Sequence, residues 1–192
     1  SASTFQITSN IYESLITVDE NGEFIPALAS SWKVSDDGLS ITFTLRDGAV
    51  FSNGKVCDSS AVKASFERLM SEISVRRADY AFITSINTPD NKTIVFNFDS
   101  LNVAALSSFA YPWAAVVDAT SENLRKKPVG TGPYVLTSWV AQQDIVLDRA
   151  PSYPYEVKND GVRFVIMPDL TAEITALDAG EESWLNDKVV SA

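Results

Sequence analysis

Apolar and polar residues along the first half of the chain follow patterns that predict short strands separated by turns. Residues 40–46 alternate with a period of two, which is the pattern of a half-buried strand. The β-branched run 11–18 predicts another strand, and residues 83–86 and 93–98 predict the two strands of a hairpin. A short helical turn is expected over residues 26–32.

Residues 58–70 give the clearest helix signal. Asp58 is a favourable N-cap. The apolar residues of this segment fall on one face at helical spacing: Ala61, Val62, Phe66, Leu69 and Met70. Further elements are expected over residues 102–109 (a helix), 134–139, 144–149 and 162–167 (strands) and 169–180 (a helix). Many strands with a few helices in irregular order predict an α/β fold, a mixed sheet with flanking helices.

Three single residues are expected inside the molecule. Trp32 and Trp139 each end an amphipathic segment, so both are expected in the core. Cys57 is the one cysteine of the sequence and is interpreted as a small buried thiol.

Composition and charge exclude several classes of function. The formal net charge of −10 argues against a nucleic-acid partner, which requires a basic face. The sequence has no histidine and one cysteine, which excludes histidine-dependent triads and a multi-cysteine zinc site. We predict no cofactor, no metal site and no enzyme activity. A carboxylate-based hydrolase has little support, because the adjacent acids at 36–37 and 181–182 point apart.

Residues 128–134 combine two glycines and two prolines and predict a rigid bend that leads into a strand. A phosphate-binding loop would open a helix and carry a Lys-Ser/Thr pair, and neither is present here. We therefore interpret Gly130, Thr131, Gly132 and Pro133 as a structural loop beside a ligand cleft.

Six segments in order resemble one family: residues 11–15 (IYESL), 26–32 (PALASSW), 37–46 (DGLSITFTLR), 51–54 (FSNG), 129–134 (VGTGPY) and 177–181 (LDAGE). Together they resemble the extracytoplasmic solute-binding proteins of peptide and nickel ABC transporters, solute-binding protein family 5. The resemblance implies the first lobe of a two-lobed periplasmic-binding-protein-like (type II) fold. We expect residues 1–180 to form this lobe, truncated, and residues 181–192 to be either the start of the crossing to a missing second lobe or only the end of the cut piece.

The function that the resemblance implies is that of a receptor for an ABC importer. It would capture an oligopeptide or dipeptide-like solute outside the membrane by closure of two lobes, and deliver it to the membrane permease. The location would be a periplasm or the cell surface, as a lipoprotein. A nickel or metal-chelate ligand is the alternative within the same family.

Five side chains are predicted to face the ligand: Phe5, Arg77, Tyr80, Tyr111 and Trp113. Flat aromatic rings suit a pocket that accepts varied side chains, and an arginine at 76 or 77 could bind a ligand carboxylate. Ordinary core packing and a solvated arginine pair are the alternatives. By alignment, Tyr111 stands where the nickel branch has an arginine, so a carboxylate-bearing metallophore is not favoured.

Overall fold

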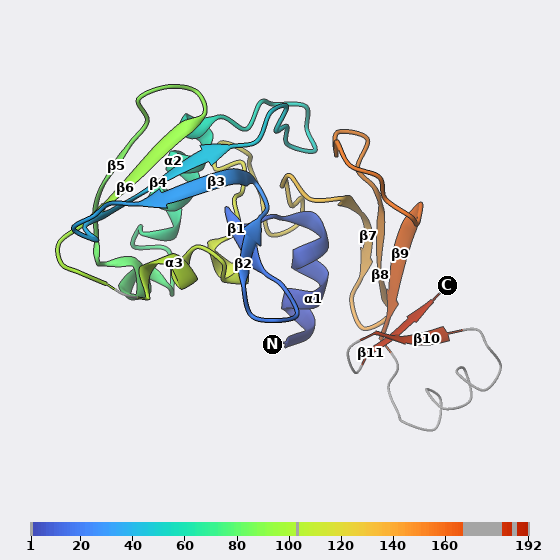
Figure 1. Ribbon diagram of the computed structural model, residues 1–192. Coiled ribbons are helices and arrows are strands. Elements are labelled where there is room, and N and C mark those ends of the chain that lie inside the picture. Colours follow the sequence, from blue (N-terminus) through green and yellow to red (C-terminus); the bar gives the residue numbers. More distant parts are fainter. Residues whose placement is uncertain (1, 103, 167–181, 186–187, 192) are drawn as a thin grey trace.

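The computed structural model describes residues 2–102, 104–166, 182–185 and 188–191 (Figure 1). The part of the fold that contains the larger hydrophobic core is built on a four-stranded sheet with the order β3-β4-β6-β5. The strands are β3 (Ala29–Val34), β4 (Ser40–Leu45), β5 (Ile83–Asn87) and β6 (Thr93–Phe98). The inward-facing residues of β4 and β6 alternate strictly with half-buried ones, as the period-two pattern predicts.

Helix α2 (Ser59–Leu69) packs against this sheet and closes the large hydrophobic core. The Asp58 carboxylate accepts a hydrogen bond from the Ala61 N–H (2.9 Å), which confirms the predicted cap. Phe66 projects from α2 into the core, where its ring lies 4.8 Å from that of Phe96. Phe109, after the short helix α3 (Ala105–Ser108), completes this aromatic cluster at 4.6 Å from Phe96.

The second part of the chain forms a five-stranded sheet with the order β10-β11-β9-β8-β7. Its strands are β7 (Tyr134–Val140), β8 (Asp144–Arg149), β9 (Gly161–Val165), β10 (Glu182–Leu185) and β11 (Lys188–Ser191). Helix α1 (Ala2–Ile11) lies between the two sheets, beside the hairpin of β1 (Ile16–Val18) and β2 (Phe24–Pro26) (Figure 1). A small core joins Ile11 of α1 to Tyr134, Leu147 and Phe164 of the sheet.

The fold class is thus confirmed as sheets with flanking helices, but the parallel pairs of a mixed sheet do not occur among the described strands. The helical turn expected over 26–32 is wrong, since β3 pairs with β4 there. The strand expected over 11–18 is confirmed only from Ile16, because Ile11 is the last residue of α1 and residues 12–15 connect the helix to the strand. The helix predicted over 169–180 lies outside the described residues.

The single-residue expectations divide. Cys57 is 2 % exposed, and burial raises the pKa of its thiol to about 12. Trp32 packs against the large core as expected. Trp139 does not: it is 57 % exposed, because β7 is the edge strand of its sheet and its second half leaves the core.

The bend at 130–133 packs against the end of α1. A Cβ atom on Gly132 would lie 2.6 Å from the Ile11 carbonyl carbon, and one on Gly130 would lie 2.3 Å from the Ile11 oxygen. Neither glycine has a positive φ. Glycine is therefore required here for close approach of two backbones, which the Gly132 N–H fixes by donating to the Ile11 oxygen at 2.9 Å.

A buried carboxylate holds the segment that leads into this bend. Asp118 is 4 % exposed and accepts hydrogen bonds from Asn53 Nδ2 (2.8 Å), Lys55 Nζ (3.0 Å), Thr120 Oγ1 (2.6 Å) and Ser121 Oγ (2.6 Å). Burial alone would raise the pKa of Asp118, but these donors outweigh it and hold that pKa well below its usual range.

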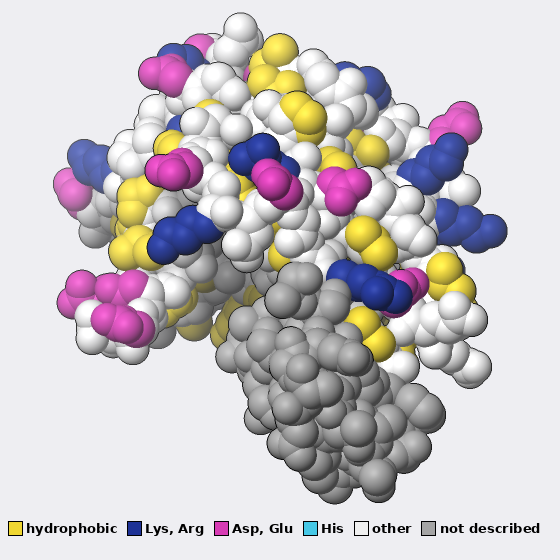
Figure 2. All heavy atoms as spheres, turned by 90° about the vertical axis from the view of Figure 1, so that its right-hand side faces the viewer, with side chains coloured by type: hydrophobic (Ala, Val, Ile, Leu, Met, Phe, Trp, Pro, Cys, Tyr) yellow, Lys and Arg dark blue, Asp and Glu magenta, His cyan; other side chains and the backbone are white. Residues whose placement is uncertain are grey.

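Charged side chains of both signs are interspersed on the face shown in Figure 2 and do not gather by sign. Every helix in the described part of the chain is too short or too polar to span a bilayer.

Candidate functional site

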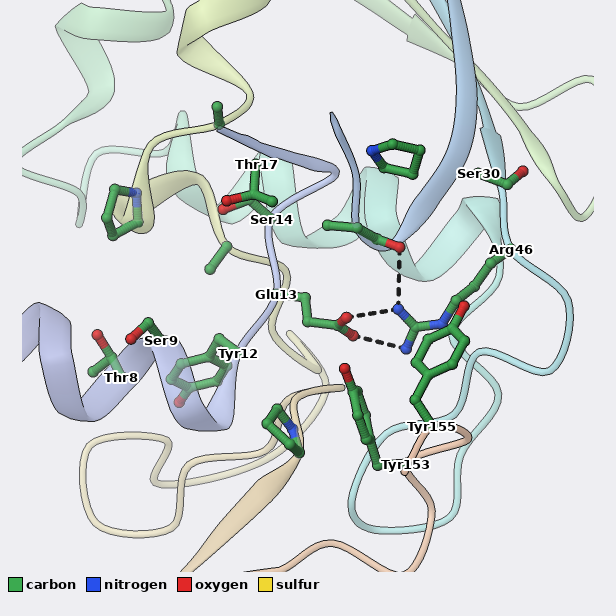
Figure 3. Close-up of a pocket in the computed structure, with 16 residues that line it drawn as sticks. Thr8, Ser9, Tyr12, Glu13, Ser14, Thr17, Ser30, Arg46, Tyr153 and Tyr155 are labelled. Atoms are coloured by element: carbon green, nitrogen blue, oxygen red, sulfur yellow. Dashed lines mark hydrogen bonds and ion pairs between the residues drawn. The ribbon is translucent and has the colours of Figure 1, made fainter. Parts of the chain in front are cut away.

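A pocket of about 560 Å³ opens along α1 (Figure 3). Most of its lining comes from four places: the end of α1 with the residues after it, the β1–β2 hairpin, the segment 110–115 and the loop that carries Tyr153 and Tyr155. Ser30, Arg46 and Pro133 complete the lining. Residues far apart in the sequence therefore meet here because α1 lies between the two sheets. The volume is that of a site for a small molecule.

A buried ion pair forms the floor of the pocket. Arg46, at the end of β4, donates from Nη1 and Nη2 to the two carboxylate oxygens of Glu13, each at 2.7 Å. Nη1 also donates to the Ala27 carbonyl at 3.2 Å. The side chains of Arg46 and Glu13 are 5 % and 12 % exposed. Burial opposes the charge of the guanidinium, but the pairing with Glu13 prevails and raises the pKa of Arg46.

Two tyrosines cover the guanidinium from the side of the second sheet. Arg46 Cζ lies 5.4 Å from the ring centre of Tyr155 and 5.8 Å from that of Tyr153. Burial raises the pKa of the Tyr153 hydroxyl. The rest of the lining is rich in hydroxyl groups, from Thr8, Ser9, Tyr12, Ser14, Thr17 and Ser30.

The pocket can therefore offer many neutral donors and acceptors, while its own charges cancel. Such a lining favours polar ligands that carry no large net charge.

A stack of three side chains involves the segment 110–115, which also contributes residues to the pocket lining. Tyr111 and Trp113 are stacked with ring centres 4.5 Å apart and planes 19° from parallel. Arg76 Cζ lies 4.2 Å from the ring centre of Trp113. At these distances Tyr111 and Arg76 cannot share one face of the indole, so they cover its two faces.

The stack is joined to the pocket by η2 (Pro112–Ala114), because Pro112 lines the pocket and lies between the two aromatic residues. The Ser14 hydroxyl donates to the Tyr111 carbonyl at 3.0 Å and anchors the same segment to the chain between α1 and β1. Phe5 lies 5.8 Å from Trp113, tilted by 53°. With Trp113 covered on both faces, the ring open to solvent is that of Tyr111, which is 43 % exposed.

The predicted ligand residues thus fall into two groups. Phe5, Tyr111 and Trp113 lie together, although the first is more than a hundred positions away from the others. Tyr80 is buried in the large core, against which Trp113 also packs: it is 1 % exposed and its hydroxyl donates to the Ser108 carbonyl at 2.7 Å, so it lies beside the stack without facing a ligand. Arg77 is exposed and lies 3.8 Å from Glu72, while its neighbour Arg76 faces the indole.

The predicted loop of Gly130, Thr131, Gly132 and Pro133 runs along the end of α1, and Pro133 lines the pocket. Sequence reasoning did not single out Glu13 or Arg46. The available signal was a charged residue inside each of two apolar, β-prone segments, which is costly unless the charges are paired.

Comparison with known proteins identifies the family. The sequence profile of the bacterial extracellular solute-binding proteins, family 5 (Middle), matches residues 23–188. The probable D,D-dipeptide-binding periplasmic protein DdpA of Escherichia coli K12 is 34% identical over 137 residues, covering 66% of this chain and 27% of DdpA. The nickel-binding periplasmic protein of the same strain is 28% identical over 187 residues, covering 90% of this chain and 35% of the relative.

Among solved structures, the PBP AgaA of A. tumefaciens R10, in complex with agropinic acid, matches with a TM-score of 0.86 and 29% identity. The match covers 94% of this chain and 38% of AgaA. It confirms the expected fold, a lobe of the periplasmic-binding-protein-like (type II) fold. This chain spans roughly a third of the length of these relatives. The chain therefore belongs to the bacterial extracellular solute-binding proteins of family 5, a family of transport proteins.

Proposed function

We propose that the chain is one wall of the solute receptor of an ABC importer and that its solute is a dipeptide or oligopeptide-like molecule. The observation that carries this proposal is a pocket lined by neutral hydroxyl groups, with the exposed ring of Tyr111 next in sequence to Pro112, which lines the pocket. An aromatic platform accepts varied side chains, and hydroxyl groups hydrogen-bond the peptide backbone.

The mechanism that follows is closure of two lobes around the solute. This chain, over residues 1–180, supplies the first lobe, and the longer gene product supplies the second. The closed state is favoured because the solute contacts both lobes at once, and the permease recognises that state. Its place of work is outside the cytoplasm, either free in a periplasm or anchored by a lipid.

The relatives leave a choice of ligand. They include a D,D-dipeptide-binding protein, a nickel-binding protein and a protein solved with agropinic acid. We favour peptides, because the resemblance implies that Tyr111 replaces an arginine of the nickel branch, and an aromatic ring lacks the guanidinium that would hold a carboxylate chelator. A nickel chelate is the second candidate.

The experiment is a thermal-shift and calorimetric screen of the complete gene product that contains this chain. The ligands are dipeptides and tripeptides with aromatic or aliphatic side chains, and NiCl₂ with and without a small chelator. We expect a peptide to raise Tm by several degrees at saturating concentration. Tyr111→Ala should lower the affinity for that peptide roughly threefold to tenfold, which is the effect expected from the loss of one aromatic contact.

Trp139→Ala is the matched control, because Trp139 is an exposed aromatic residue on the edge strand β7, outside the segment 110–115 that carries Tyr111 and lines the pocket. Binding of the nickel chelate without any peptide would replace the peptide proposal by the second candidate. No response to either class would overturn the receptor proposal.

A further inference from the structure

A second groove, of about 340 Å³, lies at the C-terminal end of α2. Within the described residues it shares only Ala115 with the pocket of Figure 3. Arg68, from the last turn of α2, and Arg125, from the loop that precedes the bend, both line it. Its lining contains no carboxylate among the described residues, in a chain whose net charge is −10.

These two arginines differ from the others in their pairing. Of the seven arginines in the sequence, five form an ion pair with a carboxylate: Arg46, Arg76, Arg77, Arg149 and Arg163. Arg68 and Arg125 pair with no carboxylate in the described part of the chain. The helix dipole favours a cation at the position of Arg68. It does not account for a second unpaired guanidinium, that of Arg125, on the same groove.

Apolar surface accompanies the two cations. Ile73 and Val75, on the loop after α2, line the groove and are 72 % and 98 % exposed. Trp113 lines it too, and reaches it as part of the stack with Tyr111 and Arg76. Exposed aliphatic side chains beside unpaired guanidinium groups form a surface that both an anion and an apolar group could cover.

We propose that this groove is a second binding site, for a carboxylate that carries an apolar side group. Arg68 and Arg125 donate hydrogen bonds to the carboxylate, and the apolar group covers Ile73 and Val75. A free organic acid and the C-terminus of a hydrophobic peptide offer the same chemistry. The proposal does not depend on the solute proposed for the pocket, since the two sites have different linings.

The test is isothermal titration of the complete gene product with three probes. N-acetyl-L-leucine carries the carboxylate and the apolar group, N-acetyl-L-leucinamide lacks the charge, and Ala-Leu supplies the carboxylate on a peptide. We expect N-acetyl-L-leucine to bind and its amide to bind at least about tenfold more weakly. Raising NaCl from 50 to 500 mM should lower the affinity for the acid. Binding of Ala-Leu through this groove identifies a peptide source, and binding of the free acid alone identifies an organic acid.

The variants are Arg68→Gln and Arg125→Gln, each expected to weaken N-acetyl-L-leucine roughly tenfold. Lys127→Gln is the matched control, because it removes one positive charge from the same loop at a residue that does not line the groove. Arg125→Lys keeps the charge, loses the bidentate geometry and should retain part of the affinity.

Equal affinity for the acid and the amide would overturn the proposal. So would unchanged affinity of the acid in both glutamine variants. An equal loss of affinity in Lys127→Gln would mean that only the overall positive charge of the loop matters, and this result would also overturn the proposal.

Discussion

The close contact between Gly132 and the end of α1 makes Gly132→Ala a sharp test of how this lobe is held together. The new methyl group would lie 2.6 Å from the Ile11 carbonyl carbon and 2.7 Å from its oxygen, and both are backbone atoms that cannot swing away. The chain must separate there, and the Gly132 N–H to Ile11 oxygen hydrogen bond of 2.9 Å lengthens or breaks.

The magnitude follows from three contributions. Overpacking costs about 1–3 kcal/mol, and the strained or lost hydrogen bond costs about 0.5–1.5 kcal/mol. The smaller entropy of the unfolded alanine chain returns about 0.4–1 kcal/mol. The net loss of unfolding free energy is therefore about 0.5–4 kcal/mol, and a loss of about 2 kcal/mol lowers Tm by roughly 4–8 °C for a chain of this size.

Urea unfolding followed by circular dichroism measures this loss, with Gly54→Ala as the control. Gly54 has a φ of +87° and no atom near its Cβ position, so its substitution tests backbone strain without steric overlap. We expect Gly54→Ala to lower the free energy of unfolding by about 1 kcal/mol and to leave solute binding unchanged. Gly132→Ala should displace α1 and thereby weaken solute binding. A Gly132→Ala protein as stable as the parent would refute the close-approach argument.

Three further outcomes are expected. Asp118→Asn should lower the unfolding free energy by about 2 kcal/mol, because charge-assisted hydrogen bonds are lost. The pKa of Asp118 is lowered in the fold, so the difference should be complete above pH of about 4 and shrink as pH falls further, as urea titrations at several pH values would show. Arg46→Met should cost about 3–5 kcal/mol, since it leaves the Glu13 carboxylate buried and unpaired; Glu13→Gln with Arg46→Met should recover part of this, and an additive double variant would contradict the pairing. Cys57, buried and with its pKa raised to about 12, should resist iodoacetamide at pH 8 in the native protein and react in urea; labelling of the native thiol would contradict the burial.

The sequence predicted correctly those elements that have a complete local pattern of their own. Asp58 and the apolar face after it were enough for α2, and the period-two alternation was enough for β4 and β6. The segment over 26–32 contains alanine and leucine, which favour a helix, but from Ala29 onward its pairing with β4 overrides that local preference. The prediction that Trp139 is buried was wrong for a related reason, since the apolar pattern of β7 does not reveal that β7 is an edge strand.

The candidate site shows the same division. The resemblance to a family brought Phe5, Tyr111 and Trp113 forward, and the structure places them together. It could not choose between Arg76 and Arg77, because adjacent residues in a short helical turn face different directions and only the tertiary fold decides which one meets the indole.

The Arg76–Trp113–Tyr111 stack has an optical consequence. The emission of an indole responds to a charge over one face and to a ring stacked on the other. A solute that covers Tyr111, or an anion that draws Arg76 from its place, would therefore change the fluorescence of Trp113. Trp32 packs against the large core and Trp139 is exposed on an edge strand, so neither of them has the surroundings of Trp113. With the other tryptophans replaced by phenylalanine, the protein would carry an intrinsic reporter of its own occupancy that needs no label.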